Sequence, residues 1–206
     1  MSIEPEQIPA PSGESRPRGR PRSERCRIAV REATAALLEE LPYGAISVEA
    51  IAARARVSKQ TIYRWWSGKH ELAMEAYAEL MDAHVGAPVT TNLESDLREL
   101  CRRSCHVLSQ RKRGTTLAGL IVAAQHDDAF AKEFRERYVL IRRKAIEALL
   151  RRGIDEGTLT PTMDIQLAID ELHGPMCYRL LLRHLPIDDA FAEALATAFL
   201  AAYRVR

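Results

Sequence analysis

The sequence is poor in the features that mark secreted, membrane-embedded or β-rich proteins. Aromatic residues make up only 6% of the 206 residues, and the four cysteines show no spacing typical of a disulfide framework. The longest apolar run, about residues 117–124, is far shorter than the roughly 20 residues that a membrane helix needs. The acidic, proline-rich start of the chain lacks the apolar centre of a signal peptide. We therefore expect no membrane partner and a reducing, cytoplasmic location.

The motifs of common enzymes and metal sites are also missing. There is no nucleophile elbow, phosphate-binding loop, zinc-protease motif or pair of acids at a familiar spacing. Cys101, Cys105 and His106 are close enough on one helix to suggest a metal, with His126 near in sequence, but no second ligand pair follows at the spacing of a zinc site. We expect the two cysteines to be small buried side chains, and we expect no catalytic residue, metal or cofactor.

Helix-favouring residues dominate the rest of the composition. Ala, Leu, Glu and Arg are abundant, runs of β-branched residues are scarce, and no segment alternates as a half-buried strand does. The sequence therefore predicts an all-α fold. Apolar spacing and capping residues predict helices at about 23–40, after Ser47, after Ser58, from 69 to about 85, and at 92–110, 115–125, 128–156, 164–185 and from 188 onward, with 111–114 as a basic loop.

Positive charge is concentrated in the first third of the chain, although the formal net charge is only +2. Residues 16–69 hold twelve Lys or Arg against five Asp or Glu, a net +7, whereas residues 71–206 hold 18 against 20, a net −2. A polyanion such as DNA is therefore the expected partner of the first third only.

Residues 47–73 have the spacing of a helix-turn-helix. Ala52 fits the place where two short helices touch, Val57 follows five residues later in the turn, and Ile62 anchors the second helix five residues beyond. With these three facing inward, the second helix exposes a surface sized for the DNA major groove, made of Ser58, Lys59, Gln60, Thr61, Tyr63, Arg64 and Trp65. A generic helical hairpin is the alternative, but it has no reason to expose Tyr, Arg and Trp together.

The string VSKQTIYRWWSGKHEL, residues 57–72, resembles the signature of TetR-family regulators, and the similarity extends from about Arg22 to Ala83. Residues 151–182 are more weakly similar to the late helices of some members. The resemblance implies a homodimeric repressor that binds an operator in double-stranded DNA and is released by a small-molecule effector. We accordingly expect a disordered tail at 1–21, a helix-turn-helix domain at 22–68, a connecting helix at 69–88 and a helical regulatory and dimerisation domain at 89–206.

The resemblance also assigns roles around the second helix. Lys59 and Gln60 would read bases, and Arg64 could reach a guanine edge. Phosphate contacts would come from Ser47, Thr61, Tyr63, Trp65 and Lys69. Trp66 falls where the family has a core aromatic and should be buried. Arg56 departs from the family, which commonly has glycine at this turn, and should cost about 1 kcal/mol if the backbone there is left-handed.

The tail carries a second basic motif. Arg18, Arg20 and Arg22 alternate with Gly19 and Pro21, which resembles the core of an AT-hook, an extended segment that lies in the minor groove of A·T tracts. Contact of these arginines with the minor groove and a merely solvated tail are both open.

Two further surfaces are expected in the second part of the chain. A ligand pocket is placed near the Gly174–Pro175 bend, with walls from His106, His126, Tyr138, His173 and Met176. A dimer interface is placed on the last two helices, through Tyr178, Leu181, Leu182, Leu185, Phe191, Leu195, Phe199 and Ala202, part of which must face the protomer's own core.

Two other readings remain open at this point. A regulator of the same fold could activate transcription or act without a ligand. A protein of another class, a helical carrier or enzyme with an incidental basic N-terminus, would not need exposed Tyr63 and Arg64 beside Lys69.

Overall fold

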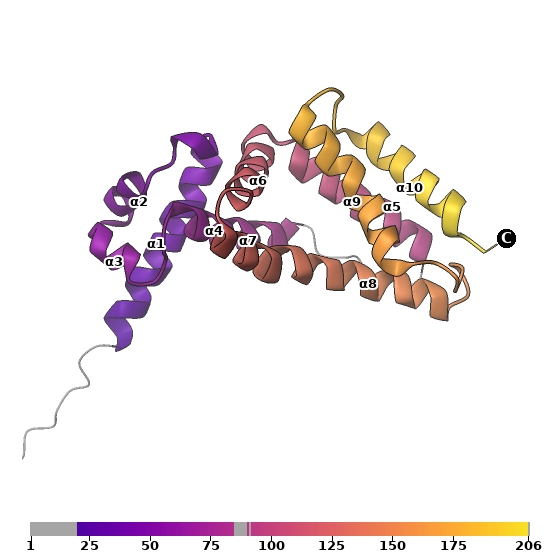
Figure 1. The fold of residues 1–206 in the computed structure, drawn as a ribbon, viewed down its shortest axis with the longest axis horizontal. Coiled ribbons are helices and arrows are strands. Elements are labelled where there is room, and N and C mark those ends of the chain that lie inside the picture. Colours follow the sequence, from indigo (N-terminus) through magenta and orange to yellow (C-terminus); the bar gives the residue numbers. More distant parts are fainter. Residues whose placement is uncertain (1–19, 85–89, 91, 206) are drawn as a thin grey trace, which may run out of the picture.

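The computed structural model describes residues 20–84, 90 and 92–205, and for residues 20–23 and 82–84 the backbone alone. The regular elements in this part of the chain are all helical, so the predicted all-α fold is confirmed (Figure 1). An N-terminal head holds α1 (Arg20–Glu40), the 3-10 turn η1 (Tyr43–Ala45), α2 (Val48–Ala55), α3 (Lys59–Tyr63) and α4 (Lys69–His84). The body holds α5 (Leu93–Ser109), α6 (Arg111–Ala124), α7 (Asp128–Phe134), the π-helical turn η2 (Arg135–Val139), α8 (Leu140–Asp155), α9 (Ile165–Leu182) and α10 (Asp189–Tyr203).

Most helices begin where a capping side chain predicts. Ser47 accepts a hydrogen bond from the backbone N–H of Ala50, and Ser58 accepts one from that of Thr61, at 3.1 and 3.2 Å. Asn92, Asp164 and Asp188 cap α5, α9 and α10 in the same way. These side chains satisfy backbone donors that have no partner inside the helix, which is why the local sequence predicts them well.

The predicted basic loop at 111–114 is wrong, because these residues form the first turn of α6. Lys112 donates from Nζ to the backbone carbonyl of Glu39, 2.6 Å away, and Arg113 donates from Nε to the Glu39 carboxylate at 2.9 Å. Two cations thus meet the carbonyl end of α1, where the helix dipole favours positive charge. This contact over more than 70 residues of sequence stabilises a helical turn that the local sequence does not suggest.

Three other boundaries differ from the prediction. Helix α1 begins at Arg20 rather than Ser23, and α9 ends at Leu182 rather than Leu185, because Arg183 takes a left-handed conformation with φ 53°. The helix expected at 128–156 is interrupted by η2, so that α7, η2 and α8 follow one another along a single bent rod (Figure 1).

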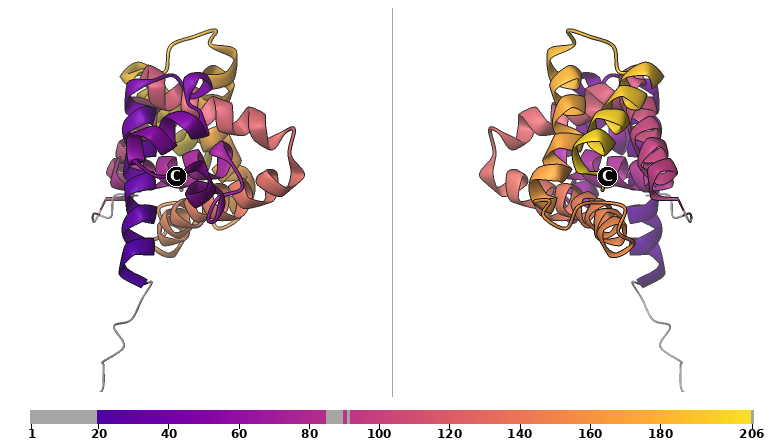
Figure 2. Two further views of the ribbon diagram at one scale, coloured as in Figure 1. Left: turned by 90° about the vertical axis from the view of Figure 1, so that its left-hand side faces the viewer. Right: turned by 90° about the vertical axis from the view of Figure 1, so that its right-hand side faces the viewer.

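Two hydrophobic cores hold the molecule together. The first core joins the head to α6, α7 and η2, and its large buried side chains include Trp66, Tyr77, Leu120, Phe130 and Tyr138. The second core lies between α5, α8, α9 and α10, around Leu97, Leu150, Ile169 and Ala196. The side views show the corner between α6 and α7 projecting from one side of the body (Figure 2). Because the first core is shared between them, the head is packed directly onto α6 and α7.

Candidate nucleic-acid interface

The helix-turn-helix of α2 and α3 is built on the three predicted apolar positions. Ile62 is fully buried, Ala52 is nearly so, and Val57 is half-buried against the first core. The turn between the helices closes with a hydrogen bond from the N–H of Val57 to the carbonyl of Ala52, 3.0 Å long. Arg56, just before it, has φ 55° and ψ 43°, which confirms the left-handed backbone that glycine would adopt at no steric cost.

Helix α3 lies at the outer edge of the head (Figure 1) and presents most of the residues that the sequence assigns to DNA. Ser58, Lys59, Gln60, Tyr63 and Arg64 are exposed, whereas Thr61 and Trp65 are half-buried. Tyr63 keeps 54% of its surface accessible although it is a large aromatic residue. A large exposed aromatic residue is unusual on a surface that faces only solvent, and the hydroxyl of Tyr63 and the donors around it could contact the phosphates along a DNA groove.

Two of the expected DNA contacts have partners inside the protein. Lys59 donates to the Glu49 carboxylate at 2.9 Å, and this hydrogen bond is the main cause that raises the pKa of Lys59. Lys69 opens α4, but its Nζ donates to the carbonyl of Ile46 at 3.1 Å and lies 5.0 Å from the centre of the Tyr43 ring. Lys59 begins α3 and Lys69 lies near its end, and both would have to share or exchange these partners on meeting DNA.

The tail arginines lie largely outside the described residues. Arg18 is not described, and the side chains of Arg20 and Arg22 are not described either. The backbone of Arg20 and Arg22 belongs to α1, which differs from the extended conformation that an AT-hook core would need there. Minor-groove contact by these three residues stays a prediction.

A buried carboxylate connects the end of α3 to the body. Trp66 is buried, as the sequence predicts, and its indole N–H donates to Glu75 Oε2 at 2.9 Å. Arg137 of η2 donates to the same oxygen at 3.2 Å, while Arg27 and Arg31 of α1 lie 3.3 and 3.5 Å from Oε1. Burial alone would raise the pKa of Glu75, but the hydrogen bonds from Trp66 and Arg137 and the nearby guanidinium charges outweigh it and lower the pKa.

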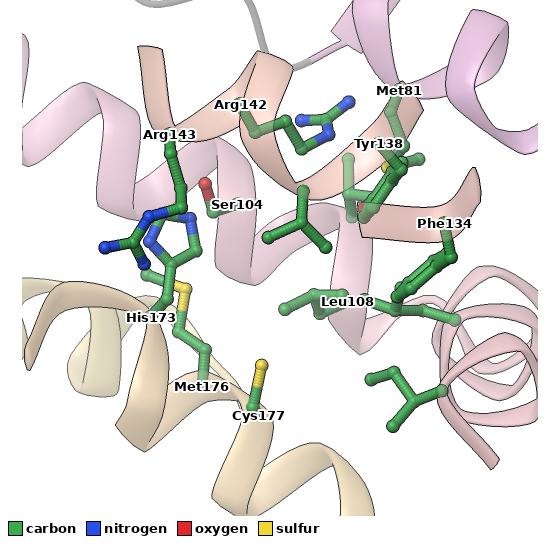
Figure 3. Close-up of a pocket in the computed structure, with 14 residues that line it drawn as sticks. Met81, Ser104, Leu108, Phe134, Tyr138, Arg142, Arg143, His173, Met176 and Cys177 are labelled. Carbon is green, nitrogen blue, oxygen red and sulfur yellow. The ribbon is translucent and has the colours of Figure 1, made fainter. Parts of the chain in front are cut away.

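A cavity of about 240 Å³ lies between α4 of the head and α5, α6, α7, η2, α8 and α9 of the body. Tyr138, His173 and Met176 line it together, and Figure 3 shows that polar groups from Ser104, Arg142, Arg143 and His173 gather on one side while Phe134 and Leu108 form the other. The remaining walls are apolar or sulfur-containing: Met81, Val107, Leu117, Ile121, Val139 and Cys177. The cavity therefore combines an apolar interior with one cationic side.

The other two histidines expected in this pocket lie elsewhere, which corrects that prediction. His106 is exposed, and a ring nitrogen lies 3.2 Å from the amide of Gln110. It follows the buried Cys105 on α5, and one residue along a helix turns the side chain by about 100° away from the core. His126 lines a separate surface groove between η1, α6 and the end of α9.

The described residues contain no cluster of His, Cys, Asp or Glu that could hold a metal ion. Cys101 and Cys105 are buried in the second core, and burial raises the pKa of the Cys105 thiol to about 11. The expectation of small buried side chains at these two positions is confirmed. Within the described part of the chain, no helix is both long enough and apolar enough to cross a membrane.

Two family models match the chain. The model for bacterial regulatory proteins of the TetR family matches residues 30–76, which contain α2 and α3, and the model for a tetracyclin repressor-like C-terminal domain matches residues 87–199. The second match alone covers more than half of the chain. The chain belongs to the TetR family of bacterial transcriptional regulators.

Individual TetR-family proteins are similar over most of their length. An HTH-type transcriptional regulator of Bacillus subtilis, YdeS, is 36% identical over 86% of this chain and 89% of its own. The DNA-binding transcriptional repressor TetR of Mycobacteroides abscessus is 32% identical over 72% of this chain and 78% of its own. The crystal structure of the TetR family transcription regulator SCO0332 superposes with a TM-score of 0.78 and 34% identity, covering 85% of this chain and 97% of that one. All three relatives are named as regulators or repressors of transcription.

The expected dimer surface of this TetR-family chain is divided between solvent and core. On α9 and just after it, Tyr178, Leu181, Leu182 and Leu185 are exposed. On α10, Phe199 is only 5% exposed and belongs to the second core, so its assignment to the interface is corrected. Phe191 and Leu195 are partly buried against the same core, and Ala202 is exposed. Helix α10 packs on α5 of its own protomer, which takes up the face that carries Phe199.

Sequence reasoning missed the charged residues of the body that meet these sites. Arg137, Arg142 and Arg143 stand among many surface arginines, and nothing in their spacing sets them apart. Two further residues were missed, Ser104 on α5 and Glu75 on α4 of the head. Each is a polar residue on an otherwise apolar helix face, and this pattern could have indicated a buried polar site, because polar side chains are buried only where they have partners.

Proposed function

We propose that this TetR-family protein is a homodimeric repressor without enzymatic activity, released from its operator by a small molecule that enters the cavity of the body. Its place of action would then be the cytoplasm, where the operator is. Repression is also the activity named for the Mycobacteroides abscessus relative.

One observation carries the ligand control. Adjacent residues of η2 face the cavity and the head: Tyr138 lines the cavity, and Arg137 pairs with Glu75, which also accepts the hydrogen bond from Trp66. Trp66 follows α3 and the two turn residues at its end, Arg64 and Trp65. A ligand that displaces Tyr138 would therefore shift Arg137 and change the support of α3.

Helix α6 offers a second connection between the same sites. Leu117 and Ile121 line the cavity, while Gly119 between them packs against the ring of Tyr43 in the head. The hydroxyl of Tyr43 lies 2.5 Å from Nδ1 of His70, next to Lys69. Because packed elements move as units, a shift of α6 would be passed on to the head.

The dimer is supported by the exposed apolar side chains of α9. Leu167, Tyr178, Leu181 and Leu182 of α9, with Leu185 just after it, are each 44–58% exposed. A run of exposed apolar side chains along one segment is typical of a protein–protein interaction site. Two copies joined there would carry two α3 helices, which need successive major grooves about 34 Å apart or a multiple of this distance.

The test uses DNA fragments selected from the host genome with the full-length protein. We expect recovery of a near-palindromic site, bound by wild type in gel shift at nanomolar concentration and lost by Tyr63→Ala/Lys69→Ala. Lys59→Ala and Gln60→Ala should relax base preference, whereas Lys69→Ala should lower affinity for all sequences and reduce the salt slope by about one.

A promoter–reporter fusion of the selected site then reads the sign of regulation. Loss of the gene should raise expression if the protein represses, and a fall would identify an activator instead. Equal affinity of wild type and Tyr63→Ala/Lys69→Ala for the selected site would contradict the assignment of α3 to DNA.

A further inference from the structure

We infer that the cavity takes a small organic acid: a compact apolar molecule, about one ring in size, whose carboxylate faces Arg142, Arg143 and His173. This inference rests on the proposed function, because it names the chemical class of the effector. It is carried by the size of the cavity, by the distribution of charge on its walls and by the hydrogen bonding of His173.

The size limits the ligand. An apolar cavity of about 150 Å³ accepts benzene, and drug-sized ligands occupy about 300–1,000 Å³. At about 240 Å³ this cavity lies between them and admits one ring with a short substituent. Phe134 and Tyr138 provide an aromatic wall, and their rings stack on each other with centres 5.2 Å apart and planes 15° apart. Leu117 and Ile121 close the cavity from α6.

The walls carry cations and no carboxylate among the described lining residues. The guanidinium of Arg142 lies 4.9 Å from the centre of the Tyr138 ring, and that of Arg143 is held by Asp170 and by Gln166, whose Oε1 is 2.8 Å away. Both arginines are half-buried, so a charge brought beside them is poorly screened. Asp170 offsets part of the charge of Arg143, but the two guanidinium groups offer only hydrogen-bond donors, which favours a ligand anion over a ligand cation.

His173 adds a group that responds to the ligand's charge. Its Nδ1 lies 3.2 Å from the carbonyl of Ile169, which can only accept, so Nδ1 carries the proton and Nε2 is the acceptor of the neutral ring. Burial is the main cause that lowers the pKa of His173, and the hydrogen bond to the Ile169 carbonyl opposes it. The charges of Arg142 and Arg143 lower the pKa further, and that of Asp170 raises it.

A bound carboxylate would favour the imidazolium form and raise the pKa of His173. Between the pKa values of the empty and the occupied cavity, binding therefore takes up a proton, and affinity rises as pH falls. Ser104, which faces the same side, is neutral and can donate to the ligand in either state (Figure 3). A neutral ligand would show no such pH dependence.

The experiment compares molecules of equal shape and different charge on the full-length protein by calorimetry at pH 7. The probes are benzoate, phenylacetate and 3-phenylpropionate, each beside its amide and its amine counterpart. We expect at least one acid to bind tenfold or more tightly than its amide, and no amine to bind more tightly than the amide. For that acid, titrations in buffers of different ionisation enthalpy should show net proton uptake.

Variants locate the effect. In Arg142→Gln/Arg143→Gln the preference for the acid over the amide should fall to threefold or less while amide binding persists, which shows that the cavity still forms. Lys144→Gln is the matched control, because it removes an exposed cation from the same helix outside the cavity and should keep the full preference.

If no acid binds better than its amide, or if an amine binds best, the inference is wrong whatever the variants do, and the same holds if no probe binds at 1 mM. The gel shift with the selected operator is run on the same protein sample. Intact operator binding with failed acid binding rejects the ligand class alone, whereas failed operator binding rejects the proposed function.

Discussion

At the scale of single residues, the contact between Gly119 and Tyr43 leaves no room for a side chain. A Cβ at Gly119 would lie 2.1 Å from Cδ1 of Tyr43, and the buried ring is also held by Lys69 and His70. We expect Gly119→Ala to lower the free energy of unfolding by about 1–3 kcal/mol, as overpacking does. Gly44→Ala is the control in urea denaturation, since nothing lies within 4 Å of its Cβ position, and should change stability by less than about 0.5 kcal/mol.

Glu75 gives a residue-scale prediction that depends on pH. Because the pKa of Glu75 is lowered in the folded protein, its carboxylate stabilises the fold above the ordinary value of 4.5, and this stabilisation is lost as pH falls through the lowered pKa. Glu75→Gln should cost about 2 kcal/mol at pH 7, with the difference from wild type shrinking below pH 4.

Glu79→Gln provides the comparison for Glu75. Glu79 lies on α4, as Glu75 does, and pairs with Arg31 of α1 at 2.7 Å. Because Glu79 is 54% exposed, its loss should change stability by less than about 1 kcal/mol. Chemical denaturation of the three proteins at pH 7 and pH 3 checks both values. Equal losses for the two variants would show that the hydrogen bonds to Glu75 add nothing beyond a surface ion pair.

At the scale of elements, the sequence predicts what is local and misses what depends on distant partners. Ser47, Ser58 and Asn92 were predictable caps because each satisfies a backbone donor three residues away. The first turn of α6 was not predictable, since its cations meet Glu39 on another helix. The π-helical turn η2 also left no signal in the apolar spacing, which continues through Phe130, Phe134 and Tyr138.

The candidate sites follow the same rule. The residues of α3 could be assigned because three apolar positions fix which face is exposed. The cavity could be placed only in part: Tyr138, His173 and Met176 line it, but its arginines come from a helix whose many cations look alike in sequence. The type of a residue does not say which way its side chain points: His106 was expected in the pocket but is exposed on α5.

The turn η2 yields a prediction about coupling. Arg137→Gln should leave ligand binding within threefold of wild type but weaken the mutual effect of ligand and operator at least fivefold, because Arg137 connects the wall residue Tyr138 to Glu75. Arg135→Gln removes an exposed cation from the same turn and serves as control. Ligand titrations with and without operator measure the effect, and unchanged coupling in Arg137→Gln would exclude this connection.

At the scale of the whole molecule, we propose that the partner copy binds the exposed apolar side chains of α9 and of Leu185 just after it. Phe199 belongs to the protomer's own core, so a charged residue at this position would damage the fold. Leu182 and Leu185 are exposed, so Leu182→Glu/Leu185→Glu should test the interface without unfolding the protomer. We expect it to sediment as a folded monomer and to lose specific operator binding at least 100-fold, because one reading head cannot span two half-sites.

Ile141→Glu is the matched control for the dimer. Ile141 is 55% exposed, like Leu182 and Leu185, but lies on α8 rather than on the α9 surface. It should sediment like wild type. A wild-type protein that is monomeric at micromolar concentration, or a dimer that survives Leu182→Glu/Leu185→Glu, would place the interface elsewhere or remove it.

The first core joins Trp66 and Tyr77 of the head to Leu120 and Phe130 of the body. Because the head shares this core with α6 and α7, loosening of these two helices removes part of the packing that keeps the head folded, so we expect these segments to open together as one unit in amide exchange. Exchange protection at α2 and α3 should thus rise when a molecule fills the cavity, although none of their atoms touches it. The DNA-reading helices would then report occupancy by their rate of opening as well as by their position.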